Sequence, residues 1–321
     1  MQSWISSHMI KDNNNPSNQG ERDFVLITGG AGFIGSHTVD LLVENGLAVV
    51  VVDREQPRFR NPEALYYQVD INSDGFENVF KEHRIKAIIH LAAQPSVSYS
   101  LCNPLADARD NILASIRVIE MAKKYNVNKI VVSSSAALYA HPQYFPIDEK
   151  HPTEYLSPYG ISKHTMEEYL KISGIDYIIF RFANVYGPRQ NSLGEAGVVA
   201  IFTDHMIQNK PVMIHGDGEQ VRDFVYVQDV ARALYLGITS SVSGELINIS
   251  TCHDTTINQL YKELKNATHY QKNAEHVATR PGDIRKSILD NAKAKKLLGW
   301  TPVVDLRGGI AQTVEFFKAI K

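Results

Sequence analysis

The sequence contains very little cysteine, which argues against a disulfide scaffold or a thiolate metal centre. Cys102 and Cys252 are the only cysteines among 321 residues. Two cysteines are too few for a disulfide framework, and neither belongs to a His/Cys cluster with metal-ligand spacing. We therefore expect no bound metal and a location in the reducing cytoplasm.

Surplus positive charge and long apolar runs are also missing. The formal net charge is −2, so the chain lacks the basic excess that neutralises a nucleic-acid backbone. No run reaches the 18 or so apolar residues of a membrane span, and the N-terminus lacks the basic-then-apolar order of a signal peptide. We expect neither a nucleic-acid partner nor a membrane partner.

The pattern that is present is an alternation of short β-branched runs with helix-length amphipathic stretches. Isoleucines at 112, 116 and 119 mark one predicted helix over 106–125, and Pro158 after a candidate Ser N-cap opens another over 158–173. This rhythm predicts a Rossmann-type, doubly wound α/β fold with a parallel sheet. The predicted strands cover residues 24–28, 48–53, 65–70, 86–92, 129–134 and 177–182.

The rhythm changes near residue 183, where glycine and proline become frequent. We expect three parts: a mobile leader over residues 1–22, a dinucleotide-binding Rossmann domain over 23–183, and a smaller α/β substrate region over 184–321 that interleaves with the first domain. No internal repeat is visible.

A glycine-rich turn follows the first predicted strand and opens a helix. Gly29, Gly32 and Gly35 stand in Gly-x-x-Gly-x-x-Gly spacing, with Phe33 and Ile34 at the start of the helix. Such glycines let backbone N–H groups approach a pyrophosphate, and the helix dipole favours the anion. A glycine motif alone is a weak signal, but its strand–turn–helix context favours a dinucleotide site.

Two further strand ends refine the choice of cofactor. Asp53 ends the second predicted strand 18 residues after Gly35, where a carboxylate accepts hydrogen bonds from ribose hydroxyls and repels a 2′-phosphate. NAD is therefore expected over NADP, although the neighbouring Arg54 is a residue that can weaken this preference. Asp70 and Ile71 end the third strand, where they can meet the adenine; a plain turn role for Asp70 is equally open.

Three residues together predict the chemistry. Tyr159 and Lys163 lie four residues apart on one helical face, and Ser135 ends a sheet strand. A tyrosine whose ordinary pKa is ~10 becomes a base near neutral pH only if its phenolate is stabilised, and the Lys163 ammonium together with an oxidised nicotinamide would do this. We expect Tyr159 to remove a proton from a sugar hydroxyl that Ser135 also binds.

These motifs resemble those of the extended short-chain dehydrogenase/reductases, and within them the nucleotide-sugar epimerases and dehydratases, over nearly the whole chain from Phe24 onward. The resemblance rests on residues 28–35, 91–94, 111, 133–135, 159–163, 181–188, 216–218, 222–224 and 280–283.

The resemblance implies a role for each matching residue. NAD would be held by the glycine turn and by Leu91, Ala92, Ala93, Asn111 and Ser133, in addition to Tyr159 and Lys163. The UDP-sugar substrate would be held by Gln94, Ser135, Asn184, Val198, Arg222, Arg280 and Asp283, with Ser287 bordering the sugar. A small residue at 287 leaves space for an N-acetyl group. A homodimer through helices 106–125 and 158–173 is also implied.

The motifs leave more than one activity open for this chain. Related 4,6-dehydratases carry an Asp-Glu pair after the catalytic hydroxyl, whereas this chain has Ala136 and Ala137. We expect 4-epimerisation of UDP-glucose or UDP-N-acetylglucosamine through a 4-keto intermediate. An NDP-hexosamine 5,6-dehydratase is the second candidate, since a 4-keto group acidifies the C5 proton. A non-catalytic NAD-binding scaffold is a third, which retention of Ser135, Tyr159 and Lys163 disfavours.

Overall fold

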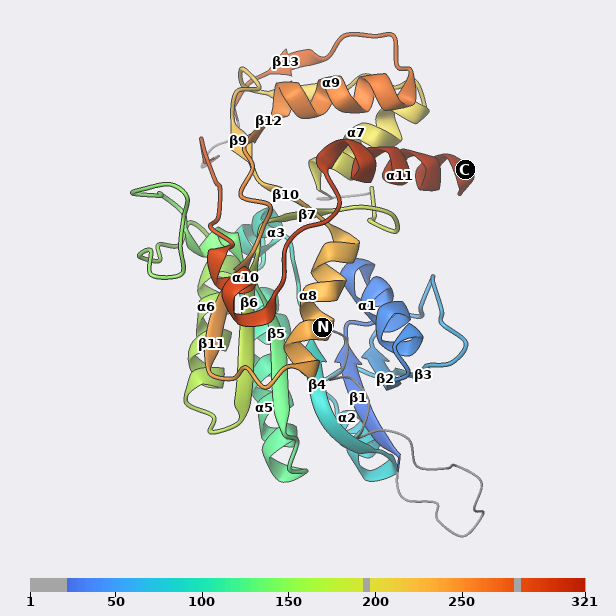
Figure 1. Ribbon diagram of the computed structural model, residues 1–321, viewed down its shortest axis with the longest axis vertical. Coiled ribbons are helices and arrows are strands. Elements are labelled where there is room, and N and C mark those ends of the chain that lie inside the picture. The colour runs from blue at the N-terminus through green and yellow to red at the C-terminus, as the bar shows by residue number, and fades with distance from the viewer. Residues whose placement is uncertain (1–21, 193–196, 280–283, 321) are drawn as a thin grey trace, which may run out of the picture.

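Seven parallel strands form the central sheet. The computed structural model describes residues 22–192, 197–279 and 284–320, so the predicted leader, apart from its last residue, lies outside the described residues. The strand order is β11-β6-β5-β4-β1-β2-β3 (Figure 1), which is the Rossmann order 3-2-1-4-5-6 extended by one strand. The bounds are β1 Asp23–Thr28, β2 Ala48–Asp53, β3 Leu65–Gln68, β4 Arg84–His90, β5 Lys129–Ser135, β6 Asp176–Phe182 and β11 Glu245–Ile249.

The predicted fold class is confirmed, and all six predicted strands are present to within two residues at each end. The seventh strand, β11, was not predicted. It comes from the second half of the chain and pairs in parallel with β6. Its five residues give too short a signal to be recognised before the partner strand is known.

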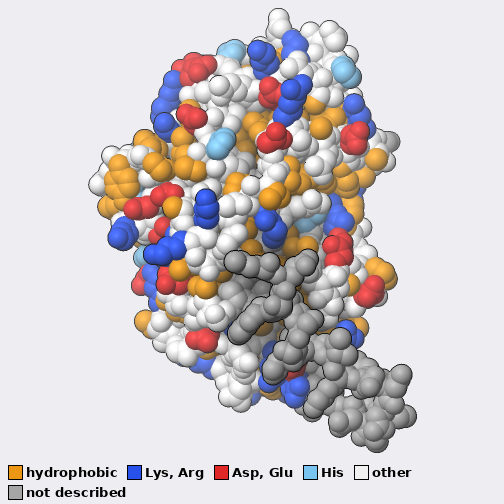
Figure 2. All heavy atoms as spheres, viewed as in Figure 1, with side chains coloured by type: hydrophobic (Ala, Val, Ile, Leu, Met, Phe, Trp, Pro, Cys, Tyr) orange, Lys and Arg blue, Asp and Glu red, His pale blue; other side chains and the backbone are white. Residues whose placement is uncertain are grey.

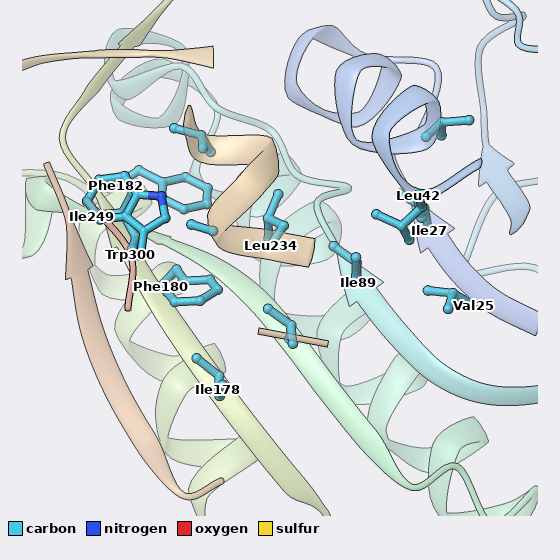
Figure 3. Packing of buried hydrophobic residues seen from close by; sticks show 14 of the residues in the cluster. Val25, Ile27, Leu42, Ile89, Ile178, Phe180, Phe182, Leu234, Ile249 and Trp300 are labelled. Carbon is cyan, nitrogen blue, oxygen red and sulfur yellow. The ribbon is translucent and has the colours of Figure 1, made fainter. Parts of the chain in front are cut away.

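Helices cover both faces of the sheet, so successive residues of a strand enter different cores. Val25 and Ile27 of β1 pack in a cluster with α1 (Phe33–Glu44) and α8 (Val227–Thr239), part of which is drawn in Figure 3. Leu26, between them, packs on the opposite face against α2 (Gly75–Glu82), α5 (Ala114–Lys124) and α6 (Pro158–Lys171).

The predicted helix over 106–125 is interrupted in the structure. Helix α4 (Pro104–Asp107) passes into a π-helical turn, η1 (Ala108–Leu113), before α5 begins. A π turn has one extra residue per hydrogen-bonded ring, which the 3.6-residue pattern does not reveal. Helix α6 begins as expected, because the Ser157 side chain accepts a hydrogen bond from the backbone N–H of Gly160 at 3.3 Å.

The second half of the chain forms a smaller region at one end of the sheet, where Figure 1 shows α7, α9 and α11 grouped together. Phe202, Leu260 and Val314 belong to its separate core. Helix α8 and β11 return to the main sheet. The remaining elements are α3 Val97–Cys102, η2 Ala136–Leu138, β7 Asn184–Tyr186, α7 Val198–Ile207, β8 Met213–His215, β9 Val221–Arg222, β10 Phe224–Tyr226, β12 Thr255–Thr256, α9 Ile257–Thr268, β13 Glu275–Val277, α10 Ala292–Leu298 and α11 Leu306–Ala319.

The surface carries charges of both signs. On the face seen in Figure 2, basic and acidic side chains are interspersed. Across residues 22–192, 197–279 and 284–320, every helix is too short or too polar to cross a bilayer. Within the same ranges, no cluster of three or more His, Cys, Asp or Glu side chains has the arrangement of a metal site.

Candidate active site

A cavity of about 740 Å³ opens at the carboxyl ends of the strands, where parallel α/β sheets bind their ligands. The chain reverses its winding between β1 and β4, and the loops after these two strands form adjacent walls of the cavity. Residues that had been predicted from sequence line it: Gly29, Gly32, Phe33, Ile34, Gly35, Asp53, Arg54, Asp70, Ile71, Leu91, Ala92, Ala93, Ser133, Ser135, Tyr159, Lys163 and Asn184.

The glycine turn has no room for side chains at two positions. Gly29 has φ +73°, and a Cβ there would lie 2.5 Å from the backbone nitrogen of Ala92. A Cβ on Gly35 would lie 2.2 Å from the carbonyl oxygen of Gly29. Helix α1 begins directly after the turn with no side-chain cap, so its first N–H groups are available to an anion. The turn therefore fits a dinucleotide diphosphate.

Asp53 lies at the end of β2 beside this turn. Its Oδ2 accepts a hydrogen bond from Ala31 N–H at 3.0 Å, and its Oδ1 accepts one from Glu55 N–H at 3.0 Å. The carboxylate is therefore held in place at the cavity wall. The Arg54 guanidinium is paired with Asp110 at 2.9 Å, so part of its positive charge is already balanced by a carboxylate at the cavity wall.

Ser135, Tyr159 and Lys163 come together at one wall of the cavity, as predicted. Ser135 is the last residue of β5, and its hydroxyl is hydrogen-bonded to the Tyr159 side chain. Lys163 lies one turn after Tyr159 on α6 and donates a hydrogen bond to the Ser133 carbonyl at 2.9 Å. Tyr159 is 9% exposed and Lys163 is 4% exposed, so both side chains are largely covered from water.

Burial changes the acidity of both groups. The pKa of Lys163 is lowered to about 8, because burial disfavours the ammonium ion. The pKa of Tyr159 is raised, because burial disfavours the phenolate more than the Ser135 hydrogen bond favours it. The sequence analysis expected Lys163 and an oxidised nicotinamide together to stabilise the phenolate, and burial acts in the opposite direction. An added positive charge at the cavity, such as an oxidised nicotinamide, is therefore needed for Tyr159 to act as a base near neutral pH.

Gln94 and Asn111 were predicted to touch ligands, but both lie behind the cavity wall. Asn111 Oδ1 accepts a hydrogen bond from Gln94 N–H at 2.8 Å, and Asn111 Nδ2 donates to Asp107 at 3.0 Å. Their side chains are 6% and 2% exposed, respectively. In the described part of the chain, their hydrogen bonds hold the loop after β4 against η1.

The predicted substrate residues of the second region are only partly assembled around the cavity. Asn184 lines it, whereas Val198, Arg222 and Ser287 do not. Arg222 donates to the Ile284 carbonyl, and Ser287 N–H donates to the Val221 carbonyl at 3.1 Å, so these two lie close to each other. Arg280 and Asp283 lie outside the described residues.

Several lining residues were not predicted from the sequence, among them Asn72, Ser96, Asp110 and Gln190. The Oε1 atom of Gln190 is buried and has no hydrogen-bond partner within the described residues. A buried acceptor without a partner is costly, so it fits a site that receives a polar ligand. The only sequence feature that could have indicated Gln190 as a site residue is its position two residues after the 181–188 motif.

Comparison with known proteins places the chain in a family of enzymes. The model of the NAD dependent epimerase/dehydratase family matches residues 25–250. A Mycolicibacterium smegmatis protein named UDP-glucose 4-epimerase is 37% identical, covering 91% of this chain and 98% of its own length.

Two solved structures have the same fold. A UDP-glucose 4-epimerase from Thermotoga maritima, solved with UDP-glucose, is 46% identical with a TM-score of 0.90 and covers 93% of this chain and 99% of its own. A UDP-N-acetylglucosamine 4-epimerase from Methanobrevibacter ruminantium M1, solved with UDP-N-acetylmuramic acid, is 30% identical with a TM-score of 0.86 and covers 94% of this chain and 100% of its own. The chain belongs to the NAD-dependent epimerase/dehydratase family and is an NAD-dependent enzyme acting on nucleotide-sugars.

Proposed function

We propose that the protein interconverts the C4 epimers of a UDP-hexose or a UDP-N-acetylhexosamine through a transient 4-keto sugar. The observation that carries this proposal is the convergence of Ser135, Tyr159 and Lys163 at one wall of the cavity that the glycine turn also lines. The UDP-sugar 4-epimerase names of the relatives in the same family support it.

Each of the three residues has a distinct role in the proposal. Tyr159 takes the proton of the sugar 4-hydroxyl, and Ser135 hydrogen-bonds the same oxygen and orients it. Lys163 supplies positive charge that favours the phenolate. The glycine turn and Asp53 hold NAD, which supplies the hydride acceptor. Reduction of the keto sugar on its other face would give the epimer, and Tyr159 would return its proton to the C4 oxygen, so no further acid or base is needed.

The second region, over 184–321, is proposed to hold the nucleotide part of the substrate. Asn184 reaches the cavity, and Arg222, Arg280 and Asp283 are retained from the sequence analysis as diphosphate and ribose contacts. Arginine suits a diphosphate because its planar fork donates two hydrogen bonds at once. Val198 and Ser287 are proposed to border the sugar, and a small Ser287 admits an N-acetyl group.

The first prediction concerns the product. Purified protein incubated with UDP-glucose or UDP-N-acetylglucosamine should convert part of the substrate to the galacto epimer, with unchanged mass and a changed C4 proton coupling in the NMR spectrum. Mass spectrometry and NMR of the nucleotide-sugar fraction measure this. Loss of one water would instead show the 5,6-dehydratase, and no conversion of either substrate would favour the scaffold.

The second prediction concerns cofactor choice. The protein should retain NAD(H) through purification, because the hydride returns to the sugar within one cycle. Asp53→Asn keeps the shape of the side chain but removes its charge, so NAD affinity should fall by about 10- to 100-fold, corresponding to loss of ~1.5–3 kcal/mol of charge-assisted hydrogen bonding. The difference between the affinities for NAD and for NADP should therefore become smaller.

Titration calorimetry of the cofactor-stripped protein with NAD and NADP measures this change. Asp110→Ala is the matched variant, since it frees the Arg54 guanidinium from its partner while Asp53 remains. That variant should gain NADP affinity with little loss of NAD affinity. Tighter binding of NADP than NAD by the parent would contradict the role of Asp53.

An apolar surface supports the proposed homodimer. Leu105 in α4 is 87% exposed and Leu113 in η1 is 56% exposed. Ile161 in the neighbouring α6 is 51% exposed, and Ile172, which directly follows α6, is 79% exposed. The pairs α4·α6 and α6·η1 are in contact. Large apolar residues gathered on neighbouring elements are characteristic of an interface between subunits.

The third prediction tests this surface. The parent should sediment as a dimer at micromolar concentration, and Leu105→Arg with Ile161→Arg should sediment as a monomer, because a buried charge opposes association. Val303→Arg is the matched control, since Val303 is 70% exposed but lies outside this surface, and it should remain dimeric. A monomeric parent would contradict the proposal.

The proposed location is the cytoplasm. Cys102 and Cys252 are both free thiols in the structure, which suits a reducing compartment.

A further inference from the structure

A buried ion pair joins helix α6 to the central sheet. Glu167 of α6 is 0% exposed, and Arg181 of β6 is 3% exposed. Arg181 Nε donates a hydrogen bond to Glu167 Oε1 at 2.8 Å, and Arg181 Nη2 donates one to Glu167 Oε2 at 2.6 Å. The two planar groups therefore meet at two points. Neither residue lines the cavity, and neither has a role in the mechanism above.

The carboxylate of this pair also binds β5. Ser134 lies opposite Arg181 in the parallel pairing of β5 with β6, and its hydroxyl donates a hydrogen bond to Glu167 Oε1 at 2.5 Å. One side chain of α6 is therefore held by two neighbouring strands. The Tyr139 ring covers the guanidinium, with its centroid 4.8 Å from Arg181 Cζ.

Glu167 continues the row on α6 that Tyr159 and Lys163 begin, since the three residues stand four apart. Each contacts one of the three consecutive serines over 133–135 at the end of β5. Lys163 donates to the carbonyl oxygen of the first at 2.9 Å, and Glu167 accepts from the hydroxyl of the second. The Tyr159 side chain is hydrogen-bonded to the hydroxyl of the third. Any rotation or sliding of α6 on β5 would therefore strain the contacts of Glu167.

Stability alone does not explain a buried ion pair at this place. Removing two charges from water costs free energy that their attraction does not always restore, and apolar residues of similar volume are often at least as stable. A two-point contact between planar groups differs from apolar packing because it is satisfied in one relative orientation. The pair is therefore suited to fix the orientation of α6.

We propose that the Glu167–Arg181 pair fixes the rotation of α6 on the sheet and thereby the position of Tyr159 at the cavity wall. Both are positioning residues that act through the helix, because neither lines the cavity. The effect on turnover rests on the proposed function. The position of Tyr159 is a property of the protein without substrate.

The test replaces the pair with apolar side chains of about the same size. Glu167→Met with Arg181→Met removes both charges, and Ser134→Ala is added so that no buried hydroxyl loses its acceptor. We expect this triple variant to unfold at or above the temperature of the parent. With NAD in excess, kcat should fall about 100-fold with little change in KM, because a displacement of about 1 Å can have this effect. Thermal unfolding and initial rates measure both quantities.

Two controls separate the pair from its surroundings. Glu168→Met with Lys171→Met removes an exposed ion pair of 2.6 Å from the same helix, and should leave kcat and the unfolding temperature near the parent values. Ser134→Ala alone keeps the buried pair, so kcat should fall by less than about tenfold, the size expected for one hydrogen bond.

Tyrosine NMR gives a readout that needs no substrate. In protein labelled with carbon-13 tyrosine and saturated with NAD, the Tyr159 signal is assigned from its absence in Tyr159→Phe. This signal should shift in the triple variant and keep its position in the variant without the exposed pair. If the parent converts none of the tested sugars, the proposed function fails, but the Tyr159 signal still decides the role of the buried pair.

A folded triple variant with the kcat and the Tyr159 signal of the parent would overturn the proposal. A lower unfolding temperature with unchanged kcat would also count against it, since the pair would then act on stability alone. Arg181→Lys is the second variant if the triple variant does not fold. It keeps the charge but replaces the two-point contact with a single one, so it should lower kcat and shift the Tyr159 signal. Parent-like values of both in Arg181→Lys would contradict the positioning role.

Discussion

Tyr159→Phe should stop turnover while leaving NAD in place. The change deletes one oxygen from a side chain that is 9% exposed, so the packing of α6 against the sheet is kept. The loss should be about 100- to 10,000-fold in kcat, the usual contribution of a positioned acid–base group. Conversion of UDP-glucose and UDP-N-acetylglucosamine, measured beside the amount of retained NAD, tests this expectation.

Tyr169→Phe is the matched control for this change. Tyr169 lies on the same helix and is 43% exposed. Removal of its hydroxyl group should therefore leave turnover unchanged. Lys163→Met should resemble Tyr159→Phe in activity and also weaken cofactor binding, since the family resemblance places Lys163 among the residues that hold NAD. A Tyr159→Phe enzyme that works near the parent rate would show that another group removes the proton.

Gly35→Ala should destroy cofactor retention, although it adds only one methyl group. The new Cβ would lie 2.2 Å from the Gly29 carbonyl oxygen and 2.6 Å from the Gly30 Cα, and these backbone atoms can make room only if the turn moves. We expect overpacking to cost about 1–3 kcal/mol of unfolding free energy. NAD affinity should fall at least about tenfold as the N–H groups are displaced.

Gly75→Ala provides the comparison within the same domain. Gly75 begins α2, and a Cβ there would lie 3.4 Å or more from its neighbours, so alanine should be neutral or stabilise the protein by up to about 1 kcal/mol. Thermal unfolding and bound NAD are measured for both variants. Gly35→Ala protein with the parent's NAD content would show that the turn does not need glycine for close approach.

Local pattern was sufficient for six of the seven strands of the central sheet and for the cofactor end of the cavity. Buried parallel strands are continuous apolar runs, so β1 and β2 were recognisable without their neighbours. The spacing of Gly29, Gly32 and Gly35 is equally local, because one turn has to meet one diphosphate. Tyr159 and Lys163 share a helix, and four residues of spacing already place them on one face.

What depends on contacts between distant segments was decided only by the tertiary structure. β11 became a strand by pairing with β6, and Asn111 faces Gln94 and Asp107 because a π turn shifts the register of its helix. The raised pKa of Tyr159 could also not be predicted from the sequence. Spacing indicates which groups are neighbours, whereas desolvation depends on how completely other segments cover them, and this cover exists only after the chain has folded.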